Sequence, residues 1–182
     1  MTTLTTRRLT LRPFSVVDEP AYARIRSEPQ VARYLAGGVE GAKQAAKTAA
    51  RLVPMFAALW SDPKGPGYGP WALIETDSDH LIGHLGLRRL DELGGETELL
   101  YALHPSSHGK GYATEGARAA LEFGFEVLKL PRIIALAAPE NAASLKVMEN
   151  VGMTRLPGLT EAFGLQVVKT EIAEADWRKG QR

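Results

Sequence analysis

Cysteine is absent from this 182-residue sequence. Disulfide bonds, thiolate metal sites and catalysis through an acyl-cysteine intermediate are therefore excluded. A long apolar run is missing as well: the longest apolar stretch, near 52–60, is too short to span a bilayer, and residues 1–13 lack the apolar segment of a signal peptide. We therefore expect a cytoplasmic protein that does not cross a membrane.

An excess of charge of either sign is also missing. The 22 basic and 21 acidic residues give a net charge of +1, so nothing in the overall charge favours nucleic acid or an anionic membrane as a partner. Hydrophobic residues at 45% and charged residues at 24% are ordinary globular values. Without a repeat, low-complexity segment or linker, residues 1–182 are expected to form one domain.

Apolar periodicity predicts a mixture of strands and helices. The expected strands are Arg8–Phe14, Trp71–Glu75, His80–Leu90, Glu98–His104, Arg132–Ala138, Met153–Leu156 and Leu165–Ala173. The expected helices are Ala21–Ser27, Val31–Leu35, Glu40–Trp60, Tyr112–Lys129 and a short one from Asn141 to near Gly152. Pro54 should kink or split its helix, and Gly83 and Gly86 indicate a bulge or a close backbone approach in their strand.

The stretch from Glu98 to Gly116 joins a strand, a glycine loop and a helix start. Gly109 and Gly111 flank Lys110, immediately before the helical spacing begins. Glycines let an anion approach the backbone N–H groups, and the first turn of a helix offers unpaired N–H groups at the positive end of its dipole. The stretch therefore predicts a phosphate site.

Two common phosphate motifs fit this loop poorly. A Walker loop needs Ser or Thr after its lysine, whereas Gly111 follows Lys110. The dinucleotide fingerprint Gly-x-Gly-x-x-Gly matches Gly109 and Gly111 but has Thr114 in place of the third glycine. A Walker-loop nucleotide triphosphatase is thus excluded, and an NAD-type protein is disfavoured.

The run His108-Gly109-Lys110-Gly111-Tyr112-Ala113 resembles the pyrophosphate loop of the GNAT superfamily of acyl-CoA-dependent N-acyltransferases, with His108 in place of the usual Gln or Arg. Three segments are similar to its RimJ/RimL-like branch, named for ribosomal-protein N-terminal acetyltransferases. They are TTRRLTLRPFSVVDEPAYARI at 5–25, GKGYATE at 109–115 and PENAASLKVMENVGM at 139–153. The resemblance covers nearly the whole chain.

The resemblance implies an α/β (α+β) fold class. In the GNAT fold, a central mixed, mostly antiparallel, twisted sheet of about seven strands is splayed between strands four and five and flanked by helices. It also implies transfer of acetyl from acetyl-CoA to a primary amine of a small molecule or a protein N-terminus. No metal is expected, and a homodimer is one option. Segments 36–70, 88–96 and 155–166 would select the acceptor.

The same resemblance implies where CoA would bind. Backbone N–H groups from Gly109 through Thr114 would hold the pyrophosphate, with added charge from His108 and Lys110. The pantetheine arm would pair with the edge of Leu100–Leu103, and a backbone N–H at Ala102 or Leu103 would face the oxyanion. Asn141 would bind pantetheine or cap its helix. The expected cofactor-binding residues are Leu103, His108, Gly109, Lys110, Gly111, Tyr112, Ala113, Thr114 and Asn141.

Glu98 and Ser144 are the candidate catalytic residues. Direct attack by the amine is favoured, because neither a cysteine nor a G-x-S-x-G elbow supports a covalent relay. Glu98 stands where some family members place a catalytic glutamate and would act as a general base through water; Glu96 is the fallback, and a merely solvated carboxylate is the alternative. Met148 occupies the position of the family's proton-donating tyrosine, so Ser144 or water would assist the leaving thiolate.

Other residues and functions are weighed against this interpretation. His80 and His84 are about 13 Å apart on a strand, too far for one metal ion, and His104 and His108 lack acidic neighbours in the sequence. Tyr101 is expected in the core or a pocket wall. Because Met148 cannot donate a proton, a non-catalytic CoA-binding sensor with the same fold is the alternative function.

Overall fold

The computed structural model describes residues 2–35, 37–61, 63 and 65–180. Within these residues, the strands are β1 (Leu4–Thr5), β2 (Leu9–Arg12), β3 (Pro70–Glu75), β4 (His80–Leu90), β5 (Glu96–Leu103), β6 (Arg132–Ala137), β7 (Thr154–Arg155), β8 (Thr160–Ala162) and β9 (Leu165–Ala173). The α-helices are α1 (Glu19–Ser27), α2 (Pro29–Ala32), α3 (Ala42–Ala58), α4 (Tyr112–Glu122), α5 (Ala142–Asn150) and α6 (Glu174–Gly180). Short 3-10 turns are η1 (Val16–Asp18), η2 (Asp91–Leu93) and η3 (Pro105–Ser107), and a π-helical turn, η4 (Phe123–Val127), extends α4.

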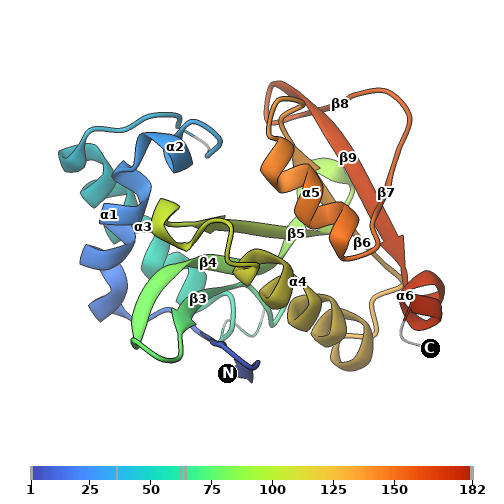
Figure 1. The fold of residues 1–182 in the computed structure, drawn as a ribbon, viewed down its shortest axis with the longest axis horizontal. Coiled ribbons are helices and arrows are strands. Elements are labelled where there is room, and N and C mark those ends of the chain that lie inside the picture. Colours follow the sequence, from blue (N-terminus) through green and yellow to red (C-terminus); the bar gives the residue numbers. More distant parts are fainter. Residues whose placement is uncertain (1, 36, 62, 64, 181–182) are drawn as a thin grey trace.

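One sheet runs through the molecule in the order β1-β2-β3-β4-β5-β6-β9-β7, with β8 paired to β9 (Figure 1). Neighbouring strands are antiparallel except for the parallel pair β5 and β6. This mixed, mostly antiparallel sheet with flanking helices confirms the predicted fold class. The two strands beyond the predicted seven, β1 and β8, have two and three residues, too few for an alternating pattern to be recognised.

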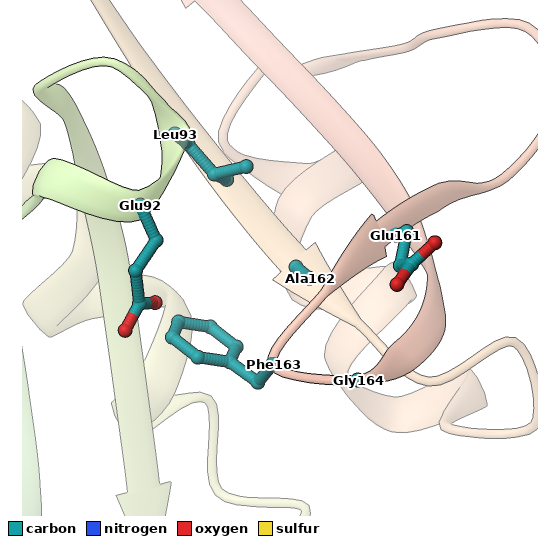
Figure 2. A pocket seen from close by; sticks show the side chains of 6 residues that line it. All are labelled: Glu92, Leu93, Glu161, Ala162, Phe163 and Gly164. Atoms are coloured by element: carbon teal, nitrogen blue, oxygen red, sulfur yellow. The ribbon is translucent and has the colours of Figure 1, made fainter.

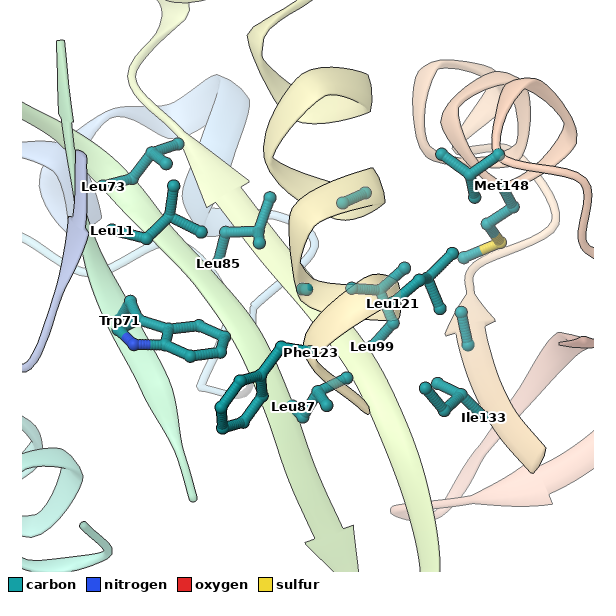
Figure 3. Packing of buried hydrophobic residues seen from close by; sticks show 14 of the residues in the cluster. Leu11, Trp71, Leu73, Leu85, Leu87, Leu99, Leu121, Phe123, Ile133 and Met148 are labelled. Carbon is teal, nitrogen blue, oxygen red and sulfur yellow. The ribbon is translucent and has the colours of Figure 1, made fainter. Parts of the chain in front are cut away.

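Helices cover both faces of the sheet. Side chains alternate between the two faces along each strand. On β3, Trp71 and Leu73 face a core shared with α4 and α5, whereas Ala72 and Ile74 face α1 and α3. Figure 3 shows the first core, in which Met148 of α5 packs with leucines of β2–β5 and α4. The two faces therefore belong to different pairs of helices.

Helix α3 continues past Pro54 to Ala58. Of the two predicted outcomes, a kink or a split, the split does not occur. Proline leaves the carbonyl four residues earlier, at Ala50, without its helical partner. Both residues are exposed, and water can therefore satisfy that carbonyl. Helix α6, which carries the buried Trp177, is an element that periodicity in so short a segment does not predict.

The predicted irregularity at Gly83 is confirmed. The pairing of β3 with β4 shifts between Leu73 and Ile74, and a Cβ atom on Gly83 would overlap the carbonyl oxygen of Ala102 and lie 2.9 Å from Cα of Leu103. Glycine at this position lets β4 approach β5 closely where β5 ends.

Gly83→Ala is expected to lower the free energy of unfolding by about 1–3 kcal/mol, because the added methyl group must push two paired backbones apart. Urea denaturation measures the change. Gly41→Ala is the matched control, since its Cβ would meet nothing within 4 Å at a φ of −66°. An equal effect of both substitutions would contradict the steric explanation.

None of the helices in the described part of the chain has both the length and the apolar character needed to cross a membrane.

Candidate active site

The glycine loop between β5 and α4, the predicted anion site, leaves backbone N–H groups without helical partners. Gly109 and Gly111 have φ values of +73° and +79°, which side-chain-bearing residues rarely adopt. The first helical bond of the turn runs from the N–H of Glu115 to the carbonyl of Gly111 (3.0 Å). The N–H groups of the three residues between them have no partner within the helix. A Cβ atom at Gly109 would meet nothing within 4 Å, so the loop leaves room for a phosphate.

The side chains of the loop point in two directions. His108 donates from Nε2 to the carbonyl of Leu103 (2.9 Å), which fastens the loop to the end of β5. The ammonium group of Lys110 lies 4.0 Å from Glu75 Oε1, and the Tyr112 hydroxyl donates to the same oxygen (2.6 Å). In this arrangement the side chains of Lys110 and Tyr112 lie against β3.

Hydrogen bonds from the N-terminal segment, which the sequence did not predict, hold the first turn of α4 in place. Glu115 accepts hydrogen bonds from the Thr6 hydroxyl (2.7 Å) and from Arg8 Nε (2.7 Å), and Arg8 Nη1 donates to the carbonyl of Lys110 (3.0 Å). Burial opposes ionisation of Glu115, but the hydrogen bonds from Thr6 and Arg8 outweigh it and hold the pKa of this carboxyl below its ordinary value. Arg8 thus offsets the negative charge of Glu115 in the first turn of α4, next to the predicted anion site.

The predicted splay lies between β5 and β6. Among their described residues, a single pair, Glu98 with Ile134, joins the two strands, and Tyr101 in the middle of β5 is only partly buried. The N–H of His104 donates toward β4, to Ile82 (2.7 Å). Because N–H directions alternate along a strand, those of Tyr101 and Leu103 face the opening. Of the two residues considered for the oxyanion, Leu103 has this orientation, whereas the N–H of Ala102 faces β4.

Glu98 is buried, with 5% of its surface exposed. It faces Arg88 directly across β4 and β5, and Arg88 binds its Oε2 from Nη2 (2.5 Å) and Nε (3.1 Å). Burial raises the pKa of the Glu98 carboxyl, although Arg88 acts in the opposite direction. The alternative prediction, that Glu98 is a solvated carboxylate at the end of a strand, is therefore wrong.

Glu96, the fallback base, is engaged twice. Its carboxylate binds Arg132 of β6 (2.7 Å) and Lys169 of β9 (2.5 Å). These contacts tie β5 to the far half of the sheet beside the splay. With both oxygens in ion pairs, Glu96 is less available than Glu98 to accept a proton.

The α5 residues named from the sequence lie on the other face of the sheet. Asn141 Oδ1 accepts from the N–H of Ser144 (3.1 Å), so Asn141 caps its helix as one of the two interpretations predicted. The Ser144 hydroxyl contacts the Tyr101 hydroxyl (3.0 Å). Met148 is 1% exposed and packs in the core. Tyr101, assigned from sequence to core or pocket wall, therefore lies beside a candidate catalytic residue.

Two of the three expected acceptor segments, 88–96 and 155–166, meet beside the turn that joins β4 to β5. Their shared pocket has a volume of about 330 Å³, and Figure 2 shows the side chains that line it. It is lined by Glu92, Leu93, Glu161, Ala162, Phe163 and Gly164. The ring of Phe163 lies 5.3 Å from the guanidinium carbon of Arg88, which links this pocket to Glu98. Residues 36, 62 and 64 of the third segment, 36–70, lie outside the described residues.

The described residues contain no group of three or more His, Asp or Glu side chains placed to hold a metal ion. His84 is fully enclosed, and burial lowers its pKa to about 3. Its Nδ1 lies 3.1 Å from the Tyr22 hydroxyl, so this histidine is a neutral core residue.

Comparison with known proteins agrees with this geometry. Residues 8–154 match the model of the acetyltransferase (GNAT) domain. The sequence is 35% identical to the uncharacterized N-acetyltransferase YnaD of Bacillus subtilis over 153 residues, covering 84% of this chain and 82% of YnaD. The crystal structure of a GNAT-family acetyltransferase from Bacillus anthracis superimposes with a TM-score of 0.77 at 26% identity, covering 96% of this chain and 99% of that one.

A shorter match, 33% identical over 72 residues, covers 40% of this chain and 39% of YdaF of Bacillus subtilis, provisionally named a ribosomal N-acetyltransferase. The length of the domain match and the identity to YnaD together settle the family. The chain belongs to the GNAT acetyltransferase family and is an N-acetyltransferase.

Proposed function

We propose that this protein transfers the acetyl group of acetyl-CoA directly to a primary amine while both substrates are bound. The observation that carries the proposal is the position of an anion site next to an unpaired strand edge. The free N–H groups at the start of α4 suit a pyrophosphate, and the open edge of β5 leads away from them toward Glu98. A pantetheine arm needs such an adjoining strand edge for its amides.

In this proposal the loop residues bind CoA mainly through the backbone. Gly109, Gly111 and the N–H groups of Tyr112, Ala113 and Thr114 surround the pyrophosphate. His108 positions the loop through its bond to Leu103, and Lys110 is half exposed, so its ammonium group is free to turn from Glu75 toward a phosphate. The N–H of Leu103 stabilises the oxyanion, and Asn141 lies at the far side of the opening.

Glu98 is the proposed general base. Arg88 engages its Oε2, which leaves Oε1 to accept a proton from the acceptor ammonium through water. An α-amino group, with a pKa of about 7.7–8.0, needs far less assistance than a lysine side chain at about 10.4. The amine then attacks the thioester carbonyl, and the carbon–sulfur bond breaks with its electron pair leaving on sulfur.

We further propose that the acceptor enters through the pocket between segments 88–96 and 155–166. Glu92 and Glu161 line the pocket. Arg88 and Arg89 line the adjoining hollow, which shares Glu92 and Phe163 with it, so charges of both signs stand beside this entrance. The RimJ/RimL-like motifs and the partial match to YdaF support a protein N-terminus; a small-molecule amine is the other acceptor class. One domain, a cytoplasmic location and a homodimer stay predictions.

The experiment has two stages. CoA at millimolar concentration should raise the Tm, because a ligand that binds only the folded state stabilises it. Acetyl-CoA with a panel of N-terminal peptides, polyamines and amino acids should then release free thiol, which a thiol reagent detects without interference from the cysteine-free chain. CoA binding without thiol release would identify the sensor alternative, and a failure to bind CoA would overturn the proposed function.

A further inference from the structure

The hydroxyl groups of Tyr101 and Ser144 meet where β5 and β6 part. The Tyr101 hydroxyl lies 2.9 Å from the carbonyl oxygen of Ser144 and 3.0 Å from its Oγ. Tyr101 belongs to β5 and Ser144 to the first turn of α5, 43 positions later in the chain. The pair therefore bridges the opening along which the pantetheine arm is proposed to run.

The direction of both hydrogen bonds follows from the number of protons. A carbonyl oxygen can only accept, so the single proton of the phenol points to the Ser144 carbonyl. The Ser144 hydroxyl must then donate to the phenol oxygen. Both O–H groups are therefore engaged, and either must rotate to donate to a ligand: the phenol gives up its bond to a carbonyl, and the serine gives up its bond to the phenol.

The surroundings keep Tyr101 protonated, so its hydroxyl stays a hydrogen-bond donor. Burial raises the pKa of Tyr101 to about 12; the hydrogen bond from Ser144 acts against this shift, and the charge of Glu98 adds to it. Met148, in the family position of the donating tyrosine, is fully packed in the core and has no proton to give. Tyr101 is partly buried, so it remains within reach of a ligand in the opening.

We propose that Tyr101 is a catalytic residue that donates a hydrogen bond to the sulfur of the departing CoA thiolate, and that Ser144 is the residue that positions its hydroxyl. This inference rests on the proposed function and changes the role expected of Ser144. It replaces the donor missing at Met148 with one supplied by the opposite wall of the opening.

The two proposed catalytic groups then stand on opposite faces of one strand. Residues three apart on a strand point to opposite sides, so Glu98 faces the α1 and α3 side and Tyr101 the α5 side. The acceptor loses its proton to Glu98 on one face. On the other face, sulfur leaves with the electron pair of the broken carbon–sulfur bond and accepts a hydrogen bond from Tyr101. Solvent supplies a proton to the thiolate after release.

The test is the acidity of the CoA thiol while it is bound. Because the chain has no cysteine, CoA carries the only thiol, and its rate of alkylation by iodoacetamide against pH reports its pKa when the protein is in excess. A hydrogen bond to an ion is lost in Tyr101→Phe, which should raise the pKa of bound CoA thiol by about one unit relative to the wild type. The value of kcat for acetyl transfer should fall at least about tenfold, with the Kd of CoA within about twofold.

Two further variants separate catalysis from structure. Ser144→Ala should raise the thiol pKa in the same direction but by less, because the tyrosine keeps its own proton. Tyr68→Phe is the matched control: its hydroxyl bonds to Thr97 of the same strand (2.7 Å), about 13 Å along β5 from Tyr101. This variant should lose stability without changing the thiol pKa.

An unchanged thiol pKa in Tyr101→Phe, with CoA still bound, would overturn the role of Tyr101 and leave the proposed function standing. A larger effect of Ser144→Ala than of Tyr101→Phe would make the serine the donor and would also overturn it. Absence of CoA binding by the wild-type protein would overturn the proposed function and this role together.

Discussion

Gly111→Trp is expected to abolish the stabilisation that CoA gives to the protein. Gly111 precedes the first turn of α4 with a φ of +79°, and an indole ring there would cover the N–H groups that are proposed to hold the pyrophosphate. At a CoA concentration of about 100 times Kd, binding stabilises the folded state by about 2.7 kcal/mol. For a chain of this size that corresponds to a Tm increase of about 5–10 °C, which the variant should lose.

The control must separate lost binding from backbone strain. A tryptophan at positive φ costs about 1–2 kcal/mol wherever it stands. Gly158→Trp imposes the same strain, because Gly158 has a φ of +74° and open space around its Cβ, but it lies far along the chain from the loop. Both variants should melt at lower temperature than the wild type, and only Gly158→Trp should still respond to CoA. An undiminished CoA response of Gly111→Trp would contradict the assigned loop.

Glu98→Gln is expected to lower kcat/KM by about 10²–10⁴, the usual contribution of a general base. The amide preserves the shape of the side chain and can still contact Arg88, but it cannot accept a proton from the acceptor. Initial rates of thiol release measure the loss with the best amine of the panel. The CoA-induced Tm increase should remain, since the pyrophosphate loop is unchanged. A rate within twofold of the wild type would exclude Glu98 as the base.

The pH dependence gives this prediction a direction. A base works only when unprotonated, and burial raises the pKa of Glu98 above its ordinary value of 4.5. The acidic limb of kcat/KM is therefore expected above pH 4.5. The linked effect on stability has the opposite sign: with a raised pKa in the folded state, the contribution of Glu98 is fully present below pH 4.5 and is lost as pH rises through its folded pKa. In Glu98→Gln both effects should disappear.

Arg88→Met completes the comparison. Arg88 lowers the pKa of Glu98 by its charge and by its hydrogen bond, so its removal should move the acidic limb to higher pH. Arg12→Met is the control. Arg12 lies on β2 and pairs with Asp18 (2.7 Å), and its removal should leave the acidic limb unchanged. A limb that stays in place in Arg88→Met would assign it to a group other than Glu98.

The sequence alone determined the features that depend on short stretches of chain. The strand, glycine loop and helix of 98–116 were predictable because glycine at positive φ and the first turn of a helix are local constraints. The bulge at Gly83 was predictable for the same reason, and the alternation of Leu9 and Leu11 with Thr10 and Arg12 identified which side chains of the first long strand share a face. Motifs of this kind also sufficed to recognise the family.

The contacts that give each site residue its environment were decided only by the tertiary structure. Arg88 faces Glu98 because of the register of β4 and β5, and Tyr101 reaches Ser144 because the first turn of α5 packs beside β5. Periodicity tells on which face a side chain lies but not which residue of another element lies opposite. That choice depends on the packing of both cores at once, so the partners of Glu98 and Tyr101 could be known only after the sheet was assembled.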